Sequence, residues 1–370
     1  MTAISRRSFA VLTAAASRAP ALARAEPPVP LIIAEGGSAG ERPEDTRSAY
    51  DLAIDEGADF IQANLVPTRE GVLVARRDNE LSATTDIASH GEFAARKTSK
   101  TIDGKTVTGW FSEDFTLGEL KTLTCRERLP ALRPANTKFD GKEPILSLQE
   151  VLEIARAGCV RTARTVGVWP RMLHAAYFDA QGLPIEARLA GELNTAGYAS
   201  SAAAVWVQAF EPGALKAFAR LSRLRRMQLI DLTGAPADDP TTPFAQMITP
   251  AGLTVVRAYA DAIAPDQDLV IDPGAALFPA PTTLILDAHT AGLSVFTRTA
   301  QAENAFLPKP LQKGDRTSAS FAAQHGDIDR LLFGLYANGV DGLATDLPAA
   351  AARARAAAIS AIARGRAQQR

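Results

Sequence analysis

Short apolar runs and amphipathic stretches alternate along most of this chain, in the rhythm of buried strands followed by helices. The first pair is a strand at Leu31–Ile33 and a helix at Thr46–Glu56, which Gly57 ends. Further strands are expected, in chain order, at Thr165–Trp169, Ala204–Gln208, Met227–Leu232, Asp261–Ala264, Leu293–Thr297 and Gly342–Thr345. Further helices are expected at Leu148–Ala157, Gly213–Leu221, Ala251–Tyr259, Thr282–Ala291, Ile328–Asn338 and Ala349–Ala363.

One connection departs from this alternation, because it joins two strands without a helix between them. Asp59–Val66 has the pattern of a strand, and the turn Pro67–Gly71 leads directly into another strand at Val72–Arg76. Because a parallel pairing needs a crossover of about a dozen residues, so short a turn predicts an antiparallel hairpin. We therefore expect Val72–Arg76 to fold back as an arm and to bring Arg77 and Asp78 towards the strand ends.

Without this arm, eight strands with helices between most of them predict a (β/α)8 TIM-type barrel. Residues 82–145 are charged and rich in turns, and we expect them to form one large insertion above the barrel. The alternative is a doubly wound open sheet. After the first strand, however, EGGSAG leads to Pro43 and not directly into a helix, unlike a dinucleotide-binding turn.

Composition narrows the possible partners. The chain has 370 residues, 46% of them hydrophobic, and a net charge of -1, so it has enough apolar residues for a large core and no basic excess for nucleic acid or an anionic membrane. It contains no run of eighteen apolar residues, so no membrane span is expected. Cys125 and Cys159 are its two cysteines. A disulfide between them and two free thiols both stay open.

The N-terminus has the features of an export signal. Ser5–Phe9 reads SRRSF, a twin-arginine pattern, and the apolar stretch Ala10–Ala16 and a small-x-small site at Ala23–Ala25 follow. A frayed basic N-terminus is the other interpretation. We favour a signal at residues 1–25, a mature chain of residues 26–370, and a periplasmic or secreted location reached by twin-arginine export.

Candidate chemistry lies at the C-terminal mouth that such a barrel forms. Gln62 and Asn64 are two residues apart on one strand, so both side chains point to the same face. His174 is the one histidine with a plausible route into this mouth. The other polar candidates at the strand ends are Glu35, with Gly36 and Gly37 behind it, Arg77, Asp78 and Arg171.

Several long segments resemble the glycerophosphodiester phosphodiesterase family, of the larger exported bacterial kind. The segments that carry the resemblance include RPEDTRSAYDLAIDEGADFI, VPTREGVLVARRDNELSATTD, GWFSEDFTLGELKTL and GVDGLATDLP. The resemblance runs from about Leu31 to Pro348. It implies a barrel that hydrolyses glycerophosphodiesters to glycerol 3-phosphate and an alcohol with Ca²⁺ or Mg²⁺. It also marks Gly37, Glu44 and Thr46 as retained framework.

The same resemblance implies an acid/base pair that this chain lacks. The family opens with Ala-His-Arg-Gly, whose histidine exchanges protons and whose arginine binds phosphate, whereas Glu35 and Gly36 stand at these positions. The second catalytic histidine is replaced by Arg77. Arginine stays protonated in proteins, so Arg77 cannot be the acid partner of a Glu35 base.

The positions that the resemblance assigns to the metal are also substituted. The family's Glu-x-Asp is Gln62-Ala63-Asn64 here, and a further metal-binding glutamate and a lysine two residues on are Arg171 and Leu173. Divalent cations prefer carboxylates, and Arg171 adds a positive charge instead. We therefore predict no metal cofactor.

These substitutions favour a barrel that is catalytically impaired or inactive, and they leave alternatives open. Arg77 and Arg171 could together bind a small phosphodiester or another anion without metal, since guanidinium groups bind oxyanions in a bidentate way. Ion pairs of Arg77 with Glu35, or of Arg171 with a glutamate, could instead close the pocket. Residual or altered hydrolysis is the remaining alternative. The sequence does not identify the ligand or the oligomeric state.

Overall fold

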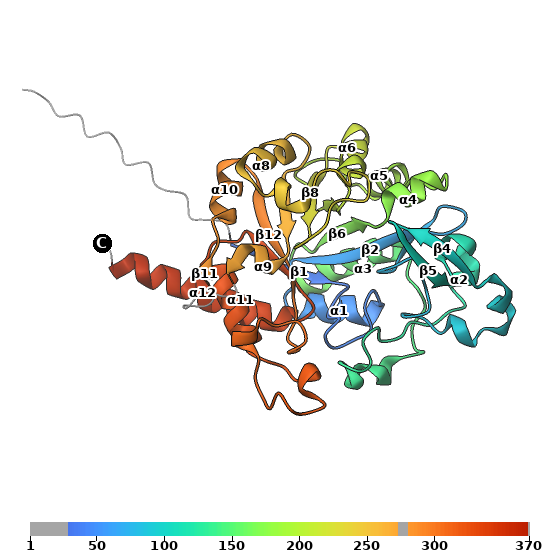
Figure 1. Cartoon of the computed structure of the whole chain (residues 1–370), viewed down its shortest axis with the longest axis horizontal. Coiled ribbons are helices and arrows are strands. Elements are labelled where there is room, and N and C mark those ends of the chain that lie inside the picture. The colour runs from blue at the N-terminus through green and yellow to red at the C-terminus, as the bar shows by residue number, and fades with distance from the viewer. Residues whose placement is uncertain (1–28, 273–279, 369–370) are drawn as a thin grey trace, which may run out of the picture.

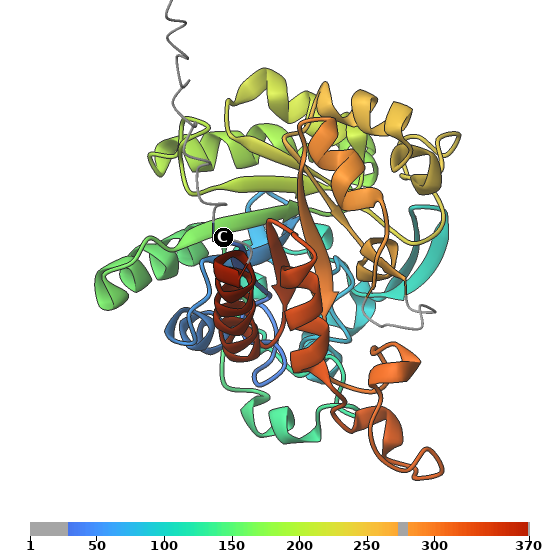
Figure 2. The ribbon, with the colours of Figure 1, turned by 90° about the vertical axis from the view of Figure 1, so that its left-hand side faces the viewer.

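The computed structural model describes residues 29–272 and 280–368, so the predicted export signal lies outside the described residues. Eight parallel strands form a closed barrel with helices around it (Figures 1 and 2). The barrel predicted from the sequence is therefore confirmed, because β13 pairs with β1 and β1 pairs with β2. Around the barrel the strands are β1 (Leu31–Glu35), β2 (Phe60–Pro67), β6 (Gly167–Met172), β7 (Trp206–Ala209), β8 (Arg225–Ile230), β9 (Ala262–Pro265), β12 (Ser294–Ala300) and β13 (Gly342–Thr345).

Helices connect these strands on the outside of the barrel. Several of them begin with side-chain caps: in α1, for example, Thr46 accepts the Ala49 N–H, and in α3 Ser147 forms a capping box with Glu150. Four others, α4, α5, α7 and α9, had no counterpart in the predicted pattern. The helices outside residues 82–145 are α1 (Arg47–Asp55), α3 (Leu148–Thr162), α4 (Ala175–Ala180), α5 (Ile185–Thr195), α6 (Pro212–Leu221), α7 (Phe244–Met247), α8 (Pro250–Arg257), α9 (Gln267–Val270), α10 (Leu284–Thr290), α11 (Ile328–Ala337) and α12 (Pro348–Gln368).

The antiparallel arm is present as predicted. β3 (Leu73–Ala75) pairs with β2, with Leu65 opposite Ala75 and Pro67 opposite Leu73. Its turn needs a glycine at position 71, where φ is +77° and a Cβ would lie 2.8 Å from the Arg188 guanidinium.

Residues 82–145 pack against the barrel and share its hydrophobic core, to which they contribute Trp110, Phe115 and Cys125. Cys125 and Cys159 are both free thiols, so they form no disulfide. The segment contains η1 (Ile87–Ser89), η2 (Gly91–Arg96), the hairpin of β4 (Thr98–Ile102) and β5 (Lys105–Gly109), η3 (Ser112–Asp114), α2 (Leu117–Leu120) and η4 (Pro134–Phe139). Elsewhere lie the ladder of β10 (Ile271–Asp272) and β11 (Ala280–Pro281), η5 (Lys309–Leu311) and η6 (Phe321–Ala323).

The barrel interior is filled by large side chains and is not a channel. Trp169 and Trp206 both meet Phe296 edge to face, with ring centroids 5.2 and 5.3 Å apart. Trp169 thus belongs to the core and does not line a ligand pocket. Polar side chains also lie on the strands, and those of the predicted site are Glu35 of β1, Gln62 and Asn64 of β2, and Arg171 of β6. Within the described residues, no helix is long and apolar enough to span a bilayer.

Candidate functional site at the barrel mouth

Strand register brings the polar residues of three adjacent strands together at the mouth. Glu35 of β1 is opposite Gln62 of β2, and Asn64 of β2 is opposite Arg171 of β6. All four side chains are buried, with exposed fractions of 4% or less. Gln62 and Asn64 therefore face a shared interior. Arg171 lies within its strand and not after the strand as the sequence suggested.

Glu35 is the centre of this site. Its Oε1 accepts hydrogen bonds from Arg171 Nη1 at 3.0 Å and from Arg77 Nη1 at 3.3 Å, and its Oε2 accepts the Thr299 hydroxyl. Burial alone would raise the pKa of the Glu35 carboxyl, but Arg171 and Arg77 outweigh burial and hold that pKa well below its ordinary value. Glu35 is therefore ionised, and it is a poor base because it holds a proton only in strong acid.

The amides of β2 continue the network towards a buried carboxylate. Gln62 Oε1 accepts a bond from Arg171 at 3.4 Å, and Gln62 Nε2 donates to Asn64 Oδ1 at 3.4 Å. Asn64 Nδ2 in turn donates to Asp45 at 3.1 Å, and the Tyr50 hydroxyl donates to the same carboxylate at 2.6 Å. Burial raises the pKa of Asp45. Sequence analysis missed Asp45, although it lies between the framework residues Glu44 and Thr46.

Arg77, at the end of the arm, lies between two carboxylates. Besides Glu35, its Nη1 is 4.0 Å from Glu44, which also receives two bonds of 3.1 Å from Arg128 Nε. Arg128 comes from the 82–145 segment and had not been predicted as a site residue. Arg77 is one-third exposed, whereas Arg171 is 4% exposed. Of these two arginines, Arg77 is thus the one that solvent or a ligand can reach.

The turn after β1 passes too close to α1 for side chains. Gly36 and Gly37 have φ values of +65° and +86°. A Cβ on Gly37 would lie 2.5 Å from the Ala49 carbonyl carbon, which is closer than any real contact. Gly37 is thus required by the fold. Gly36 has more space, with Glu44 Cβ at 3.0 Å, so its positive φ is the stronger restriction.

The end of β12 supplies a further arginine that the sequence did not indicate. Arg298 bonds to Asp231, donates to the carbonyls of Ile230 and Ala264 at 3.2 and 3.3 Å, and lies over the Phe210 ring at 4.6 Å. Its charge lowers the pKa of both Glu35 and Arg171, although burial is the largest cause at Arg171. Arg298 therefore adds positive charge around Glu35 without touching it.

His174 lies at the edge of the mouth, and both nitrogens of its imidazole already face carboxylates. Its Nδ1 is 2.5 Å from Asp103, at the tip of the β4–β5 hairpin, and its Nε2 is 3.9 Å from Asp78. Burial would lower the pKa of His174, but these two partners outweigh burial and raise it to about 9. The imidazole is therefore charged at neutral pH and fastens the hairpin to the start of α4.

Several other residues that could have contributed chemistry have structural contacts instead. His90 and His289 pair with carboxylates near the surface, and Leu173 is buried in the core. Glu303 and Asp346 both bind the guanidinium of Arg133, whose Nη1 also donates to the Ala39 carbonyl at 2.8 Å. This group ties the 82–145 segment to the ends of β12 and β13.

The residues at the metal positions do not fit a divalent cation. Gln62 and Asn64 present neutral amides, and Gln62 Oε1 already accepts a bond from Arg171. That guanidinium would repel a cation at this point. Among the described residues, no group of three or more histidine, cysteine, aspartate or glutamate side chains is arranged to hold a metal. We therefore derive no chemical step from a bound metal.

Comparison with known proteins identifies the family. A statistical model of the glycerophosphoryl diester phosphodiesterase family matches residues 37–350. The chain belongs to this family. The match begins at Gly37, directly after Glu35 and Gly36.

Glycerophosphodiester phosphodiesterase relatives come from plants and bacteria. Glycerophosphodiester phosphodiesterase GDPD6 of Arabidopsis thaliana is 32% identical over 290 residues, which cover 75% of this chain and 76% of the relative. A glycerophosphodiester phosphodiesterase of Haemophilus influenzae is 24% identical, covering 65% of this chain and 70% of the relative. Family membership and these phosphodiesterase relatives support the family reaction as the chemistry of the family.

Solved structures of the family share the fold. The crystal structure of a glycerophosphodiester phosphodiesterase from Agrobacterium tumefaciens has a TM-score of 0.54 and 17% identity, covering 88% of this chain and 99% of that one. An Oleispira antarctica phosphodiesterase in complex with the product sn-glycerol-3-phosphate has a TM-score of 0.54 and 16% identity, covering 88% and 96%. At identities this low, the structural similarity shows that the chain shares the barrel fold. It does not show which reaction the chain carries out.

Proposed function

We propose that this chain is a glycerophosphodiester phosphodiesterase family barrel that does not carry out the family's metal-dependent hydrolysis. The observation that carries the proposal is the pairing of one carboxylate, Glu35, with both Arg171 and Arg77. These three residues stand at positions that the family resemblance assigns to an acid/base pair and a metal ligand. Here the two guanidinium groups pair with the one carboxylate.

Phosphodiester hydrolysis needs a base, an acid and cationic stabilisation of the phosphoryl oxygens. The low pKa of Glu35 makes it a weak base, and Arg77 remains protonated. Losing one proton-transfer group costs about 10²–10⁴ in rate, and here a pair is missing together with the metal carboxylates. Residual hydrolysis is therefore expected to be negligible.

Metal binding tests this proposal without depending on substrate choice. By calorimetry, the wild-type protein should show no Ca²⁺ binding at the mouth. A triple variant that restores the carboxylates, Gln62→Glu, Asn64→Asp and Arg171→Glu, should bind Ca²⁺. A control with the same change in charge at exposed positions in or next to helices should not; it carries Gln181→Glu, Asn194→Asp and Arg220→Glu. Stoichiometric Ca²⁺ binding by the wild type that Glu35→Gln abolishes would contradict the proposal, because it would place the ion at the mouth.

A second candidate function is metal-free binding of a small anion, and the exposure of Arg77 favours it. Three guanidinium groups, those of Arg77, Arg128 and Arg171, share the two carboxylates Glu35 and Glu44 in the ion pairs of the mouth. Arg77 holds Glu44 only at 4.0 Å and is one-third exposed, so it is free to turn towards an oxyanion. A glycerophosphodiester or its phosphate product has the chemistry for such a contact.

Calorimetry with sn-glycerol 3-phosphate in the presence of a chelator tests anion binding. We expect chelator-insensitive binding that Arg77→Ala abolishes. Arg69→Ala is the matched control, because Arg69 is a more exposed arginine on the same hairpin, paired with Glu119 at 3.9 Å. If Arg77→Ala and Arg69→Ala weaken binding equally, the anion is held only by non-specific electrostatic attraction. The mouth would then be closed by its ion pairs and would bind no ligand.

We further propose that the protein is exported by the twin-arginine route and is periplasmic or secreted. The support is the sequence pattern at Ser5–Phe9 and the small-residue site before Glu26. Cell fractionation of the full chain and of an Arg6→Lys/Arg7→Lys variant tests this. The variant should stay in the cytoplasm, and an unchanged distribution would refute the route.

A further inference from the structure

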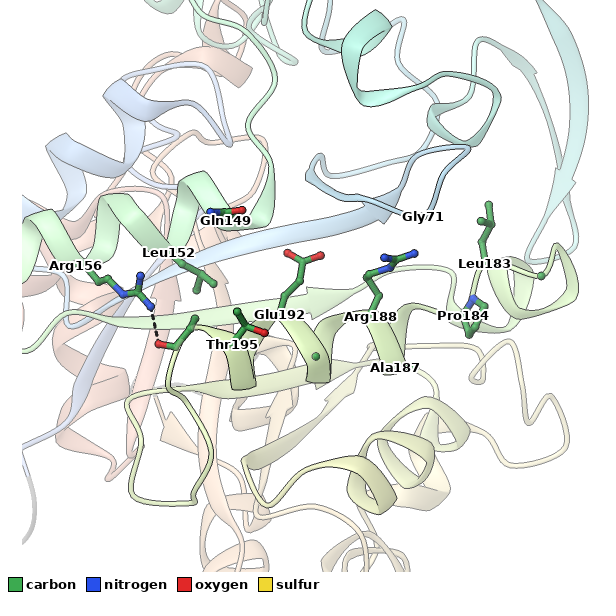
Figure 3. Close-up of a pocket in the computed structure, with 13 residues that line it drawn as sticks. Gly71, Gln149, Leu152, Arg156, Leu183, Pro184, Ala187, Arg188, Glu192 and Thr195 are labelled. Carbon is green, nitrogen blue, oxygen red and sulfur yellow. Dashed lines mark hydrogen bonds between the residues drawn. The ribbon is translucent and has the colours of Figure 1, made fainter.

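A groove of about 680 Å³ runs between α3 and α5 on the outside of the barrel (Figure 3). Its volume is within the range of small-ligand sites, and its lining includes none of the residues that bond to Glu35. From α3 it is lined by Leu152 and Arg156. From α5 it is lined by residues that recur every three or four positions and so share one face of the helix: Ala187, Arg188, Gly191, Glu192 and Thr195.

An arginine lies at each end of this groove, and a backbone carbonyl holds each one. Arg156 Nη2 donates to the Ala196 carbonyl at 2.5 Å, where α5 ends, and Arg188 Nη2 donates to the Glu70 carbonyl at 3.3 Å. Arg188 and Ala196 are two helical turns apart, about 12 Å. Both arginines are exposed, and within the described parts of the chain neither forms an ion pair. A guanidinium carries five N–H donors, so each keeps donors for a ligand.

Glu192 lies midway between the two ends, one turn after Arg188 on the same face of α5. Residues four apart on a helix often pair, but Arg188 reaches the Glu70 carbonyl instead. Among the described residues, the Glu192 carboxylate forms no ion pair and no hydrogen bond. Burial raises the pKa of Glu192, and the charge of Arg188 only partly opposes the rise. The carboxylate therefore has room for a further positive partner.

Charge thus alternates along the groove, from positive to negative to positive, with about 6 Å between neighbouring groups. Leu152 and Leu183 supply an apolar wall between them. The groove is open at Gly191, where a Cβ would meet no atom within 4 Å. A ligand that matches this order carries a carboxylate at each end and an N–H donor between them. With a contact of about 3 Å at each arginine, its carboxylates stand about 6 Å apart, which is the spacing of a short diacid.

This order of charges excludes simpler ligands. A diamine would be repelled by the two arginines, and a chain of closely spaced anions would be repelled by Glu192. A diacid without nitrogen would satisfy the arginines and leave Glu192 unpaired. We propose that the groove binds a small amino dicarboxylate, of the acidic amino acid class, with its carboxylates on Arg156 and Arg188 and its ammonium group towards Glu192.

Calorimetry with L-glutamate and with glutarate on the full chain tests the proposal, because glutarate has the two carboxylates but no ammonium group. The wild type should bind glutamate more tightly than glutarate, and Glu192→Gln should abolish this preference. Arg156→Gln or Arg188→Gln should weaken glutamate binding about tenfold, since a charged hydrogen bond is lost. The matched control is Arg220→Gln, an exposed arginine of α6 outside this groove, which should bind like the wild type.

A steric variant separates loss of binding from loss of folding. Gly191→Leu should block glutamate binding by filling the open space, and it should melt at or above the wild-type temperature because leucine favours a helix more than glycine does. Unchanged glutamate binding by Gly191→Leu would overturn the proposal. So would the absence of glutamate binding at millimolar concentration, equal affinity of the wild type for glutamate and glutarate, or equal losses in Arg188→Gln and Arg220→Gln. Arg77→Ala should leave glutamate binding unchanged, and a loss there would place the anion at the mouth instead.

Discussion

Arg171 Nη1 lies 3.0 Å from Glu35 Oε1, and both side chains are almost fully buried. The pair joins two positions that the family resemblance assigns to different tasks, one to the metal and one to proton transfer. A single ion pair thus occupies the place of both. Its surroundings explain why the site is stable: Arg77, Thr299 and Gln62 each bond to one of the two partners.

Arg171→Met should destabilise the fold by about 3 kcal/mol, because the buried Glu35 carboxylate then loses the nearer of the two guanidinium groups that bond to it. Urea denaturation measures the change. The control is Arg161→Met on α3, where an arginine 40% exposed pairs with Asp51 and Asp55. There the loss should be below about 1 kcal/mol. Similar losses in the two variants would show that the mouth pair is not desolvated as described.

Replacing both Glu35 and Arg171 should lower the free energy of unfolding by less than the sum of the two single replacements. Glu35→Gln alone leaves two arginines without their shared carboxylate, and Arg171→Met alone leaves the carboxylate. The double variant removes the imbalance, so the two changes should couple by about 1–3 kcal/mol in a double-mutant cycle. Strict additivity would mean that the pair contributes nothing through direct contact.

The raised pKa of His174 gives a pH dependence of defined sign. Its stabilising contribution is complete below the unfolded pKa of about 6.5, and it is lost as pH rises from there through the folded pKa of about 9. Wild-type stability should therefore fall by up to about 3 kcal/mol across this range relative to His174→Gln. His325→Gln, which leaves the Asp103 and Asp78 contacts intact, should follow the wild-type profile. Parallel profiles for His174→Gln and wild type would contradict this assignment.

Arg133 should hold the 82–145 segment on the barrel. Its Nε is 2.6 Å from Glu303, it also binds Asp346, and its side chain is 4% exposed. Arg133→Met leaves two buried carboxylates unpaired and should cost about 3–5 kcal/mol. Limited proteolysis should then cut first within the segment. Arg126→Met changes an exposed arginine of the same segment and should leave the cleavage pattern unchanged.

The barrel could be predicted because its strands are short apolar runs and its helices carry one apolar face. Where those signals were weak, the prediction failed. α4 has only six residues, and the residue before it, its N-cap His174, has a φ of +52°, which is unusual for a residue other than glycine. α5 begins after Pro184 without a side-chain cap. These two helices were therefore absent from the predicted pattern.

The candidate residues at the mouth could be named from the sequence, but their partners could not. Which carboxylate Arg171 meets depends on the strand register that places Asn64 beside it and Gln62 beside Glu35. Arg128 reaches Glu44 across 84 residues of sequence separation, and no local pattern indicates such a contact. Of the alternatives left open, the ion pairs of Glu35 with Arg77 and Arg171 are present in the structure.

Turnover is the most direct test of the central claim. The purified protein is incubated with glycerophosphocholine and saturating Ca²⁺ or Mg²⁺, and release of sn-glycerol 3-phosphate is followed with and without a chelator. We expect no release above the protein-free blank with either metal. Sustained release that the chelator abolishes would contradict it, because the mouth would then bind a metal and exchange protons despite Glu35, Arg77 and Arg171.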